Sequence, residues 1–241
     1  MTARGREIAD VMERRNVDIL CVQETRWKGN GARDLGADCK ILYSGSRGGR
    51  NGVGVIVKGI WRDRVLEVNR ISDRLMSMKV LLKSKKLTVI SGYAPQVGCT
   101  EEVKEEFRNN LEEAIREVPD TESLVVGADL NGRVGRTSEG YEDVHGGRGF
   151  GTRNEEGERI LEMAESLQLV LVNTWFEKRE EHIITYKSGG RSTQIDYLLV
   201  RKEDWRVVKN CKVIPGEPCV TQHRVLVADC MWKTGGASKY F

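Results

Sequence analysis

Short β-type segments follow one another through most of the sequence, and they constrain the fold more than any other feature. Between residues 39 and 94 they are separated by Gly, Asn, Asp and Lys turns and read CKILYS, NGVGVIV, RVLEVN, LMSMKVLL and KLTVISGYA. Further strands are predicted at VDILCVQ, at 123–128, and at LQLVLVN, HIITYK, QIDYLLV, WRVVKNCKVI and RVLVADCMW. Helical spacing of apolar residues predicts helices at 4–15, 101–118 and about 155–167. Many strands with few helices predict an α/β fold in which two β-sheets pack together with helices outside.

The length of the chain favours a single domain. The sequence has 241 residues, of which 39% are hydrophobic, enough for one sizeable core. We expect the domain to cover residues 1–235, with a short tail at 236–241. The apolar runs are far shorter than the ~20 residues that span a bilayer, and the charged start lacks the pattern of a signal peptide. The sequence therefore predicts a soluble intracellular protein, nuclear or cytoplasmic, without membrane contact and not secreted.

Cysteine usage gives no sign of a metal site or a disulfide framework. The six cysteines are scattered, without a CxxC pair or a histidine at zinc-finger spacing. Free thiols in a reducing compartment are favoured over disulfides or zinc.

Charge is distributed unevenly although the net charge is only +3. Four glycine-rich segments carry Lys or Arg and no acid: SGSRGGRN, NGRVGR, HGGRGFGTR and KSGGRSTQ. The predicted helix at 101–118 is instead rich in glutamate. This sorting favours a phosphate-bearing partner on a basic face, with ordinary solvated loops as the alternative.

Polar residues stand where several predicted strands end. Glu24 follows VDILCVQ, Tyr93 ends LTVISGY, Asp129 ends SLVVGAD, Asp196 lies in QIDY, and His223 precedes the last apolar strand. Taken singly, each has an ordinary interpretation as a cap, a core tyrosine or a packed histidine. The segment after Asp129 is also an Asn-Gly turn signal.

Taken in order, these pieces resemble the endonuclease/exonuclease/phosphatase superfamily. The shared motifs are QET at 23–25, GYAP at 92–95, GADLN at 127–131, QIDY at 194–197 and TQH at 221–223. Nearly the whole chain is covered. The details QETRWKG, GYAPQVG, GADLNGRVG and GTRNEEGERILEMA are most similar to the endonuclease domain of RTE- or BovB-type non-LTR retrotransposons. The resemblance implies a four-layer, DNase I-like sandwich and a phosphodiester hydrolase that uses Mg²⁺ or Mn²⁺.

The resemblance also implies roles for individual residues. Glu24 would bind the metal through a hard carboxylate oxygen. Asp129 would orient and deprotonate the attacking water, with Asn131 on the same side of the extended backbone. Asp196 would hold His223 in one tautomer and keep it protonated, ready to bind a phosphoryl oxygen.

A nucleic acid, with DNA favoured over RNA, is the implied partner. Tyr93 would offer its hydroxyl to the transition state. The glycine-rich loops would follow the phosphate backbone, and Asn154 would either contact phosphate or simply cap the next helix. The candidate nucleic-acid-binding residues are Arg133, Arg136, Arg148, Arg153, Asn154 and Arg191.

Two departures from the family pattern bear on activity. The resemblance implies a strand ending in Asn before the first helix, and no such strand precedes the helix predicted at 4–15. Its absence would leave the neighbouring strand with an unpaired edge. In addition, Gln222 replaces an acid before the histidine. The leading hypothesis is a DNA-nicking endonuclease. A catalytically impaired nucleic-acid-binding remnant of the same fold is the alternative, and a phosphatase for small phosphate esters is the third.

Overall fold

The structure is a computed structural model that describes residues 2–217, 222–232 and 239–240. Thr221 of the TQH motif lies outside the described residues, as do 236–238 and 241 of the predicted tail. The remaining tail residues form the two-residue strand β15 (Lys239–Tyr240), which pairs with Asp229 and Cys230.

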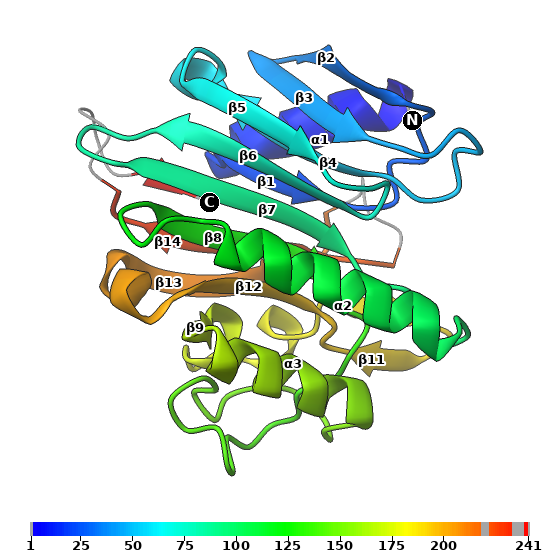
Figure 1. The fold of residues 1–241 in the computed structure, drawn as a ribbon, viewed down its shortest axis with the longest axis vertical. Helices are drawn as coiled ribbons and strands as arrows, with labels where there is room; N and C mark the ends of the chain where they lie inside the picture. The colour runs from blue at the N-terminus through cyan, green and yellow to red at the C-terminus, as the bar shows by residue number, and fades with distance from the viewer. Residues whose placement is uncertain (1, 218–221, 233–238, 241) are drawn as a thin grey trace.

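One continuous sheet of six strands runs through the molecule (Figure 1). Its strand order is β5-β6-β7-β8-β12-β9, with β7 and β8 parallel and the other neighbours antiparallel. Both faces of its central strands are covered, so their sequences are nearly continuous apolar runs. The strands are β5 (Val65–Arg70), β6 (Leu75–Leu81), β7 (Lys86–Tyr93), β8 (Ser123–Asp129), β9 (Leu169–Leu171) and β12 (Asp196–Arg201).

The second β layer is split into two parts. One part has the order β1-β4-β3-β2 and the other β13-β14-β15, and no described strand joins β1 to β14. Both parts contribute apolar residues to the core facing the six-stranded sheet, including Val55, Val57, Cys211 and Ala228. The strands are β1 (Ile19–Val22), β2 (Asn30–Gly36), β3 (Cys39–Ser44), β4 (Val53–Lys58), β13 (Val208–Ile214) and β14 (Val225–Cys230).

Helices cover the outer faces of both β layers. α2 (Glu101–Arg116) and α3 (Glu155–Ser166) pack on the six-stranded sheet through stripes that include Phe107, Leu111 and Leu161. α1 (Thr2–Arg15) covers the split layer through Ala9 and Met12. The order helix, sheet, sheet, helix gives the expected four-layer α/β sandwich.

Smaller elements surround these layers. A hairpin of two short strands and several 3₁₀ turns complete the described chain. They are β10 (Tyr186–Ser188), β11 (Arg191–Thr193) and the turns Gly59–Arg62, Val172–Thr174, Glu180–His182 and Lys202–Val207.

The structure differs from the sequence prediction in several strands. HIITYK is extended only at Tyr186 and Lys187, in β10, because His182 ends a 3₁₀ turn. β2 was not expected, because NGARDLG contains a single large apolar residue, the buried Leu35. It forms nonetheless as the exposed edge of a hairpin with β3, where pairing needs little burial. LQLVLVN contains only the three-residue β9, since Val172–Thr174 turns to place Asn173 against β12, where its side chain bonds the backbone of Asp196 and Leu198.

None of the helices in the described parts of the chain combines the length and the apolar character that crossing a bilayer requires.

Candidate active site

Three predicted site residues form one row across the six-stranded sheet. Asp129 of β8 lies directly opposite Asp196 of β12 on one side and Tyr93 of β7 on the other. Residues paired in register project from the same face of a sheet. Backbone hydrogen bonds from Ala94 to Asp129 and from Leu130 to Ile195 continue the pairing past the strand ends. The sheet itself therefore sets the spacing of these three side chains.

Glu24 and His223 reach this row from the split layer. Glu24 follows β1, and its Oε1 accepts a hydrogen bond from the Tyr93 hydroxyl at 2.8 Å. His223 precedes β14, and its Nδ1 lies 3.1 Å from both carboxylate oxygens of Asp196. Its Nε2 lies 3.9 Å from Oδ2 of Asp129. Glu24, Asp129, Asp196 and His223 line one cavity.

The acids around His223 determine its charge. Burial alone would lower the pKa of His223, but the hydrogen bond and charge of Asp196, with the charges of Asp129 and Glu24, raise that pKa to about 9. Burial and the charge of Asp196 raise the pKa of Asp129, and the charge of His223 offsets part of this effect. The imidazole is thus protonated at neutral pH beside a carboxylate that binds protons more readily than usual, as suits an acid and a base in one site.

Glu24 is held in a strained backbone conformation with both carboxylate oxygens engaged. Its φ is +50°, a region that costs most non-glycine residues free energy and is concentrated at functional sites. Oε2 is 2.8 Å from the guanidinium of Arg26, the other oxygen being bonded to Tyr93. Burial would raise the pKa of Glu24, but these two hydrogen bonds lower it. Glu24 therefore presents an ionised carboxylate, while burial and Glu24 raise the pKa of Tyr93 and keep its hydroxyl protonated.

Asn131 occupies the turn after β8 at φ +50°, which asparagine tolerates. Its backbone NH donates to Oδ1 of Asp129 at 3.1 Å, and its side-chain amide donates to the carbonyl of Ala94 at 2.8 Å. It therefore closes the strand as a turn residue and at the same time fixes the Asp129 carboxylate.

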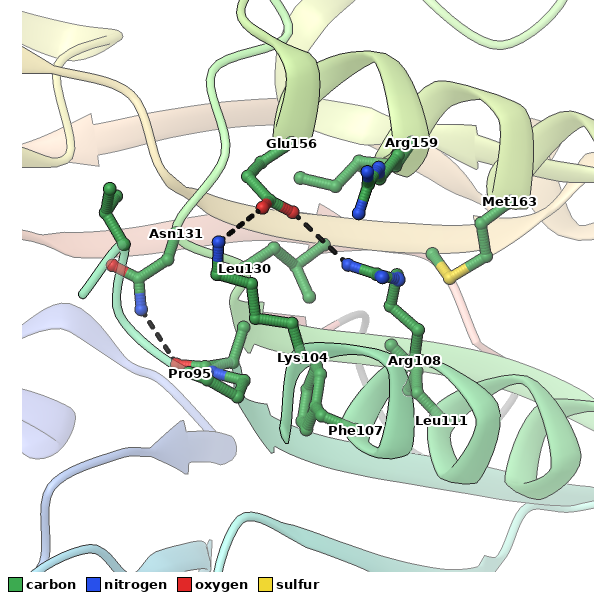
Figure 2. Close-up of a pocket in the computed structure, with 13 residues that line it drawn as sticks. Pro95, Lys104, Phe107, Arg108, Leu111, Leu130, Asn131, Glu156, Arg159 and Met163 are labelled. Atoms are coloured by element: carbon green, nitrogen blue, oxygen red, sulfur yellow. Dashed lines mark hydrogen bonds and ion pairs between the residues drawn. The ribbon is translucent and has the colours of Figure 1, made fainter. Parts of the chain in front are cut away.

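A second, small pocket borders Asn131 on the side of α2 and α3 (Figure 2). Its floor is apolar, and Lys104 reaches across it to Glu156 at 3.0 Å. Arg108 lies 3.4 Å from the same glutamate. Because Lys104 and Arg108 are both paired with Glu156, these ion pairs join α2 to α3 and leave neither cation free to bind an anion.

Two of the predicted nucleic-acid-binding residues are engaged inside the protein. Arg153 donates to backbone carbonyls of Val134, Thr137 and Glu139 and pairs with Glu158 at 3.1 Å, which holds the loop after β8. Asn154 accepts hydrogen bonds from the backbone NH groups of Arg133 and Gly157. Its contacts are those of a helix N-cap.

The other four arginines lie at or near the surface. Arg136 and Arg148 are exposed and form ion pairs with Glu180 and Glu177 at 2.9 and 2.8 Å. Arg191 is exposed in the β10–β11 hairpin, and Arg133 is half-buried in the loop after Asp129.

Apart from Asp196, the sequence interpretation did not identify the residues around His223. The ring of Tyr186 lies edge-on to the imidazole, with centroids 4.7 Å apart. Gln222 donates to Oγ of Ser188 at 3.0 Å, so it binds the β10–β11 hairpin. HIITYK carries no signal beyond a strand pattern, and the contact arises only when the hairpin folds against His223.

The donor atoms fit an oxygen-preferring divalent cation. Ligand atoms of Asp129, Asp196 and His223 lie within 4.8 Å of one another. Among these groups the carboxylates supply the oxygen atoms that a hard divalent cation prefers. Glu24 is the ionised carboxylate with a partly exposed side chain, 34% accessible, and carboxylate with water is the ligand set that Mg²⁺ prefers.

Comparison with known proteins identifies relatives along most of the chain. The family model of the endonuclease/exonuclease/phosphatase family matches residues 1–218. Craniofacial development protein 2 of Bos taurus is 34% identical over 222 residues, and that of Tragulus javanicus is 32% identical over the same length. These matches cover 90% of this chain but only 37% and 38% of the relatives, so the chain spans little more than a third of their length.

Solved structures share the fold at low sequence identity. The endonuclease domain of TRAS1, a telomere-specific non-LTR retrotransposon, has a TM-score of 0.64 at 14% identity, covering 93% of this chain and 90% of its own. An AP endonuclease from Archaeoglobus fulgidus has a TM-score of 0.69 at 19% identity, covering 92% of both chains. The 3′ phosphatase NExo from Neisseria, bound to a product DNA hairpin, has a TM-score of 0.70 at 15% identity and 95% coverage of both.

The superfamily contains metal-dependent nucleases and phosphatases, and its phosphodiesterase-type fold is the one described above. With the family model matched over residues 1–218 and a curated relative at 34% identity, this chain belongs to the endonuclease/exonuclease/phosphatase family.

Proposed function

We propose that this chain hydrolyses phosphodiester bonds in DNA, nicking one strand, and that it requires a divalent metal ion, Mg²⁺ or Mn²⁺, held by Glu24. The main support is the row of Tyr93, Asp129 and Asp196, over which Glu24 and a protonated His223 are placed. The likeness to the TRAS1 endonuclease domain favours a retrotransposon origin.

Each residue has a role that its contacts support. Asp129, with its raised pKa, accepts the proton of the attacking water. His223 binds a phosphoryl oxygen through Nε2–H, because Nδ1 is engaged by Asp196. Tyr93 orients Glu24 by a hydrogen bond. When bound, the metal would neutralise charge on the phosphate and polarise it.

The DNA backbone is proposed to lie along Arg133 and Arg191, with Arg136 and Arg148 exchanging their glutamates for phosphates. Exposed ion pairs are worth little, on the order of 0–1 kcal/mol, so such an exchange costs little. Arg153 and Asn154 contribute by holding the loop.

Nicking of supercoiled plasmid in Mg²⁺ tests the proposal. The Asp129→Asn variant preserves shape and can still accept the Asn131 hydrogen bond, yet cannot take the proton of water. We expect its rate to fall by roughly 10²–10⁴. Asp143→Asn is the matched control, since the side chain of Asp143 is 83% exposed and pairs with Lys202. DNA binding is measured for all three proteins by fluorescence anisotropy.

Three outcomes are distinguishable. Equal nicking by the wild type and Asp129→Asn would reject the proposed site. Binding of DNA without nicking by the wild type would show an impaired remnant. Release of phosphate from a 3′-phosphorylated oligonucleotide, with the plasmid left intact, would show a phosphatase.

A further inference from the structure

The glycine-rich segment SGSRGGRN ends at Asn51, against the residues that follow Glu24. The backbone NH of Thr25 donates to the carbonyl of Gly52 at 3.0 Å, and the NH of Arg26 donates to the carbonyl of Asn51 at 2.9 Å. These two hydrogen bonds hold the chain immediately after Glu24. A segment whose charge pattern suggested phosphate contact thus also supports the proposed metal ligand.

The chain around Glu24 needs such support because its backbone is strained. Glu24 has a φ of +50° and Arg26 a φ of +54°, both in the left-handed region. Residues other than glycine persist in this conformation only where the surrounding structure holds them there. Because the two hydrogen bonds fall on Thr25 and Arg26, they oppose relaxation of Glu24 to an extended conformation, in which its carboxylate would turn away from Tyr93.

Gly52 can approach Thr25 this closely only because it lacks a side chain. Its φ is +117°, and a Cβ atom at this position would lie 2.2 Å from Oγ1 of Thr25 and 3.3 Å from the backbone nitrogen of Arg26. The Thr25 side chain is fully buried, so it has little room to move aside. Any other residue at position 52 would therefore displace Thr25, and Glu24 with it.

Asp73 holds Asn51 and Gly52 from the turn between β5 and β6. Its Oδ2 accepts a hydrogen bond from Nδ2 of Asn51 at 2.9 Å, and its backbone carbonyl accepts one from the NH of Gly52 at 2.9 Å. Asp73 belongs to the six-stranded sheet side of the molecule, whereas Glu24 follows a strand of the split layer. The backbone after Glu24 is thereby anchored to the continuous sheet.

We propose that Asn51, Gly52 and Asp73 form a clamp that positions Glu24 in the site. The inference rests on the proposed role of Glu24 as the metal ligand. Tyr93 orients the carboxylate through its hydroxyl, and the clamp fixes the backbone that carries this carboxylate. Because Mg²⁺ demands a near-ideal ligand geometry, a Glu24 that is free to move should bind the ion more weakly.

A comparable pair, Asn210 and Asp229, provides a matched control outside the cavity that contains Glu24. The two residues face each other across β13 and β14, and Nδ2 of Asn210 donates to Oδ2 of Asp229 at 3.2 Å. Both are half-buried, as Asn51 and Asp73 are. Removing the Asp229 carboxylate therefore deletes the same kind of hydrogen bond without touching the clamp.

Calorimetric titration of the whole chain with Mn²⁺ tests the clamp without requiring activity. Glu24→Gln identifies the binding event that belongs to Glu24. Asp73→Ala should weaken this event about tenfold, as loss of a residue that orients a metal ligand typically does. Asp73→Asn keeps an oxygen that accepts from Asn51, and should stay within about twofold of the wild type. Asp229→Ala should bind Mn²⁺ like the wild type, and Gly52→Ala should bind at least about tenfold more weakly.

Hydrogen exchange of the Thr25 and Arg26 amides tests the clamp independently of the metal. Both amides should exchange about tenfold faster in Asp73→Ala than in the wild type, because the carbonyls that bind them become mobile. In Asp229→Ala both should exchange at the wild-type rate. If Gly52→Ala does not fold, Asp73→Ala decides.

The outcomes separate the clamp from the proposed metal site. Unchanged exchange of the two amides in Asp73→Ala, or equal effects of Asp73→Ala and Asp229→Ala, would overturn the clamp. Equal Mn²⁺ affinity of Asp73→Ala and the wild type would also overturn it, provided that Glu24→Gln abolishes binding. Mn²⁺ binding that survives Glu24→Gln, together with faster exchange in Asp73→Ala, would reject Glu24 as the metal ligand and still support the clamp.

Discussion

The two β layers of this molecule differ in how they position the site. The six-stranded sheet is continuous, and it carries Tyr93, Asp129 and Asp196 in one hydrogen-bonded row. The other layer is interrupted between β1 and β14, and it carries Glu24 and His223 on opposite sides of the interruption. Half of the site is thus fixed by backbone pairing, and the other half depends on side-chain contacts.

The difference teaches which distances in the site are robust. The distance between the backbones of Asp129 and Asp196 can change only if the two paired strands separate. The position of Glu24 relative to His223 depends instead on the hydrogen bonds of each residue to the row, from Tyr93 and to Asp196, and on α1, which packs on both parts of the split layer. Local opening follows the regions with fewer buried contacts, so motion in the site should concentrate on the split layer.

Truncating one leucine in each layer tests this contrast most strongly. Leu124 of β8 is fully buried beneath the helices, so Leu124→Ala should lower the free energy of unfolding by about 3–4 kcal/mol. Leu226 of β14 borders the active-site cavity, so Leu226→Ala should cost about 1 kcal/mol or less, since fewer packed atoms surround this side chain. Urea unfolding measures both. Equal losses would show that the layers are equally well packed.

The loop between β8 and α3, next to the six-stranded sheet, contains a buried histidine that should make stability depend on pH. His145 is fully buried, bonded to Gly135 and Gly147, and burial lowers its pKa to about 4. At pH values between this pKa and the unfolded pKa of about 6.5, His145 is protonated in the unfolded chain and neutral in the folded chain. The free energy of unfolding should therefore fall by about 2–3 kcal/mol between pH 7 and 4, relative to the His145→Gln variant. A pH-independent difference between the two proteins would contradict this account of the loop.

The smallest expected effect is that of replacing Arg26, which follows β1 of the split layer. Its guanidinium is 68% exposed and occupies Oε2 of Glu24, so Arg26→Ala should change the free energy of unfolding by less than about 1 kcal/mol. Freed of this competitor, Glu24 should bind Mn²⁺ up to about fivefold more tightly, measured by calorimetric titration. Arg62→Ala removes ion pairs with the exposed carboxylates of Asp34 and Asp38, and should leave Mn²⁺ binding unchanged. Weaker Mn²⁺ binding by Arg26→Ala would mean that Arg26 positions Glu24 for the metal.

The sequence predicted the layers and the gathering of Glu24, Asp129, Asp196 and His223 because both follow from local pattern and ordered motifs. Strand periodicity marks the core strands, and the family resemblance marks the residues at their ends. The sequence could not show that Arg153 donates hydrogen bonds to the carbonyls of Val134, Thr137 and Glu139. A glycine-rich loop with arginines has the same sequence pattern whether the arginines bind a phosphate or the backbone of their own loop.

Contacts between segments far apart in the chain could not be predicted from the sequence, for a physical reason. The packing of Tyr186 against His223 depends on where the hairpin of the three-residue strands β10 and β11 folds, which short-range propensity does not specify. The bridging of the split layer by α1, including the ion pairs of Arg14 and Arg15 with Glu217, likewise joins segments that are far apart in the sequence.

The row of Tyr93, Asp129 and Asp196 has a consequence for how such a chain can diverge. Inserting one residue within β8 ahead of Asp129 would turn that carboxylate to the opposite face of the sheet, since strand side chains alternate. An insertion at the exposed Gly140 leaves the row intact, because the hydrogen bond from the Arg133 backbone to Asn154 joins the two ends of the loop. Changes in length are thus tolerable at the exposed tip of this loop and prohibited in the strands beneath it, so the loop can vary without loss of the row.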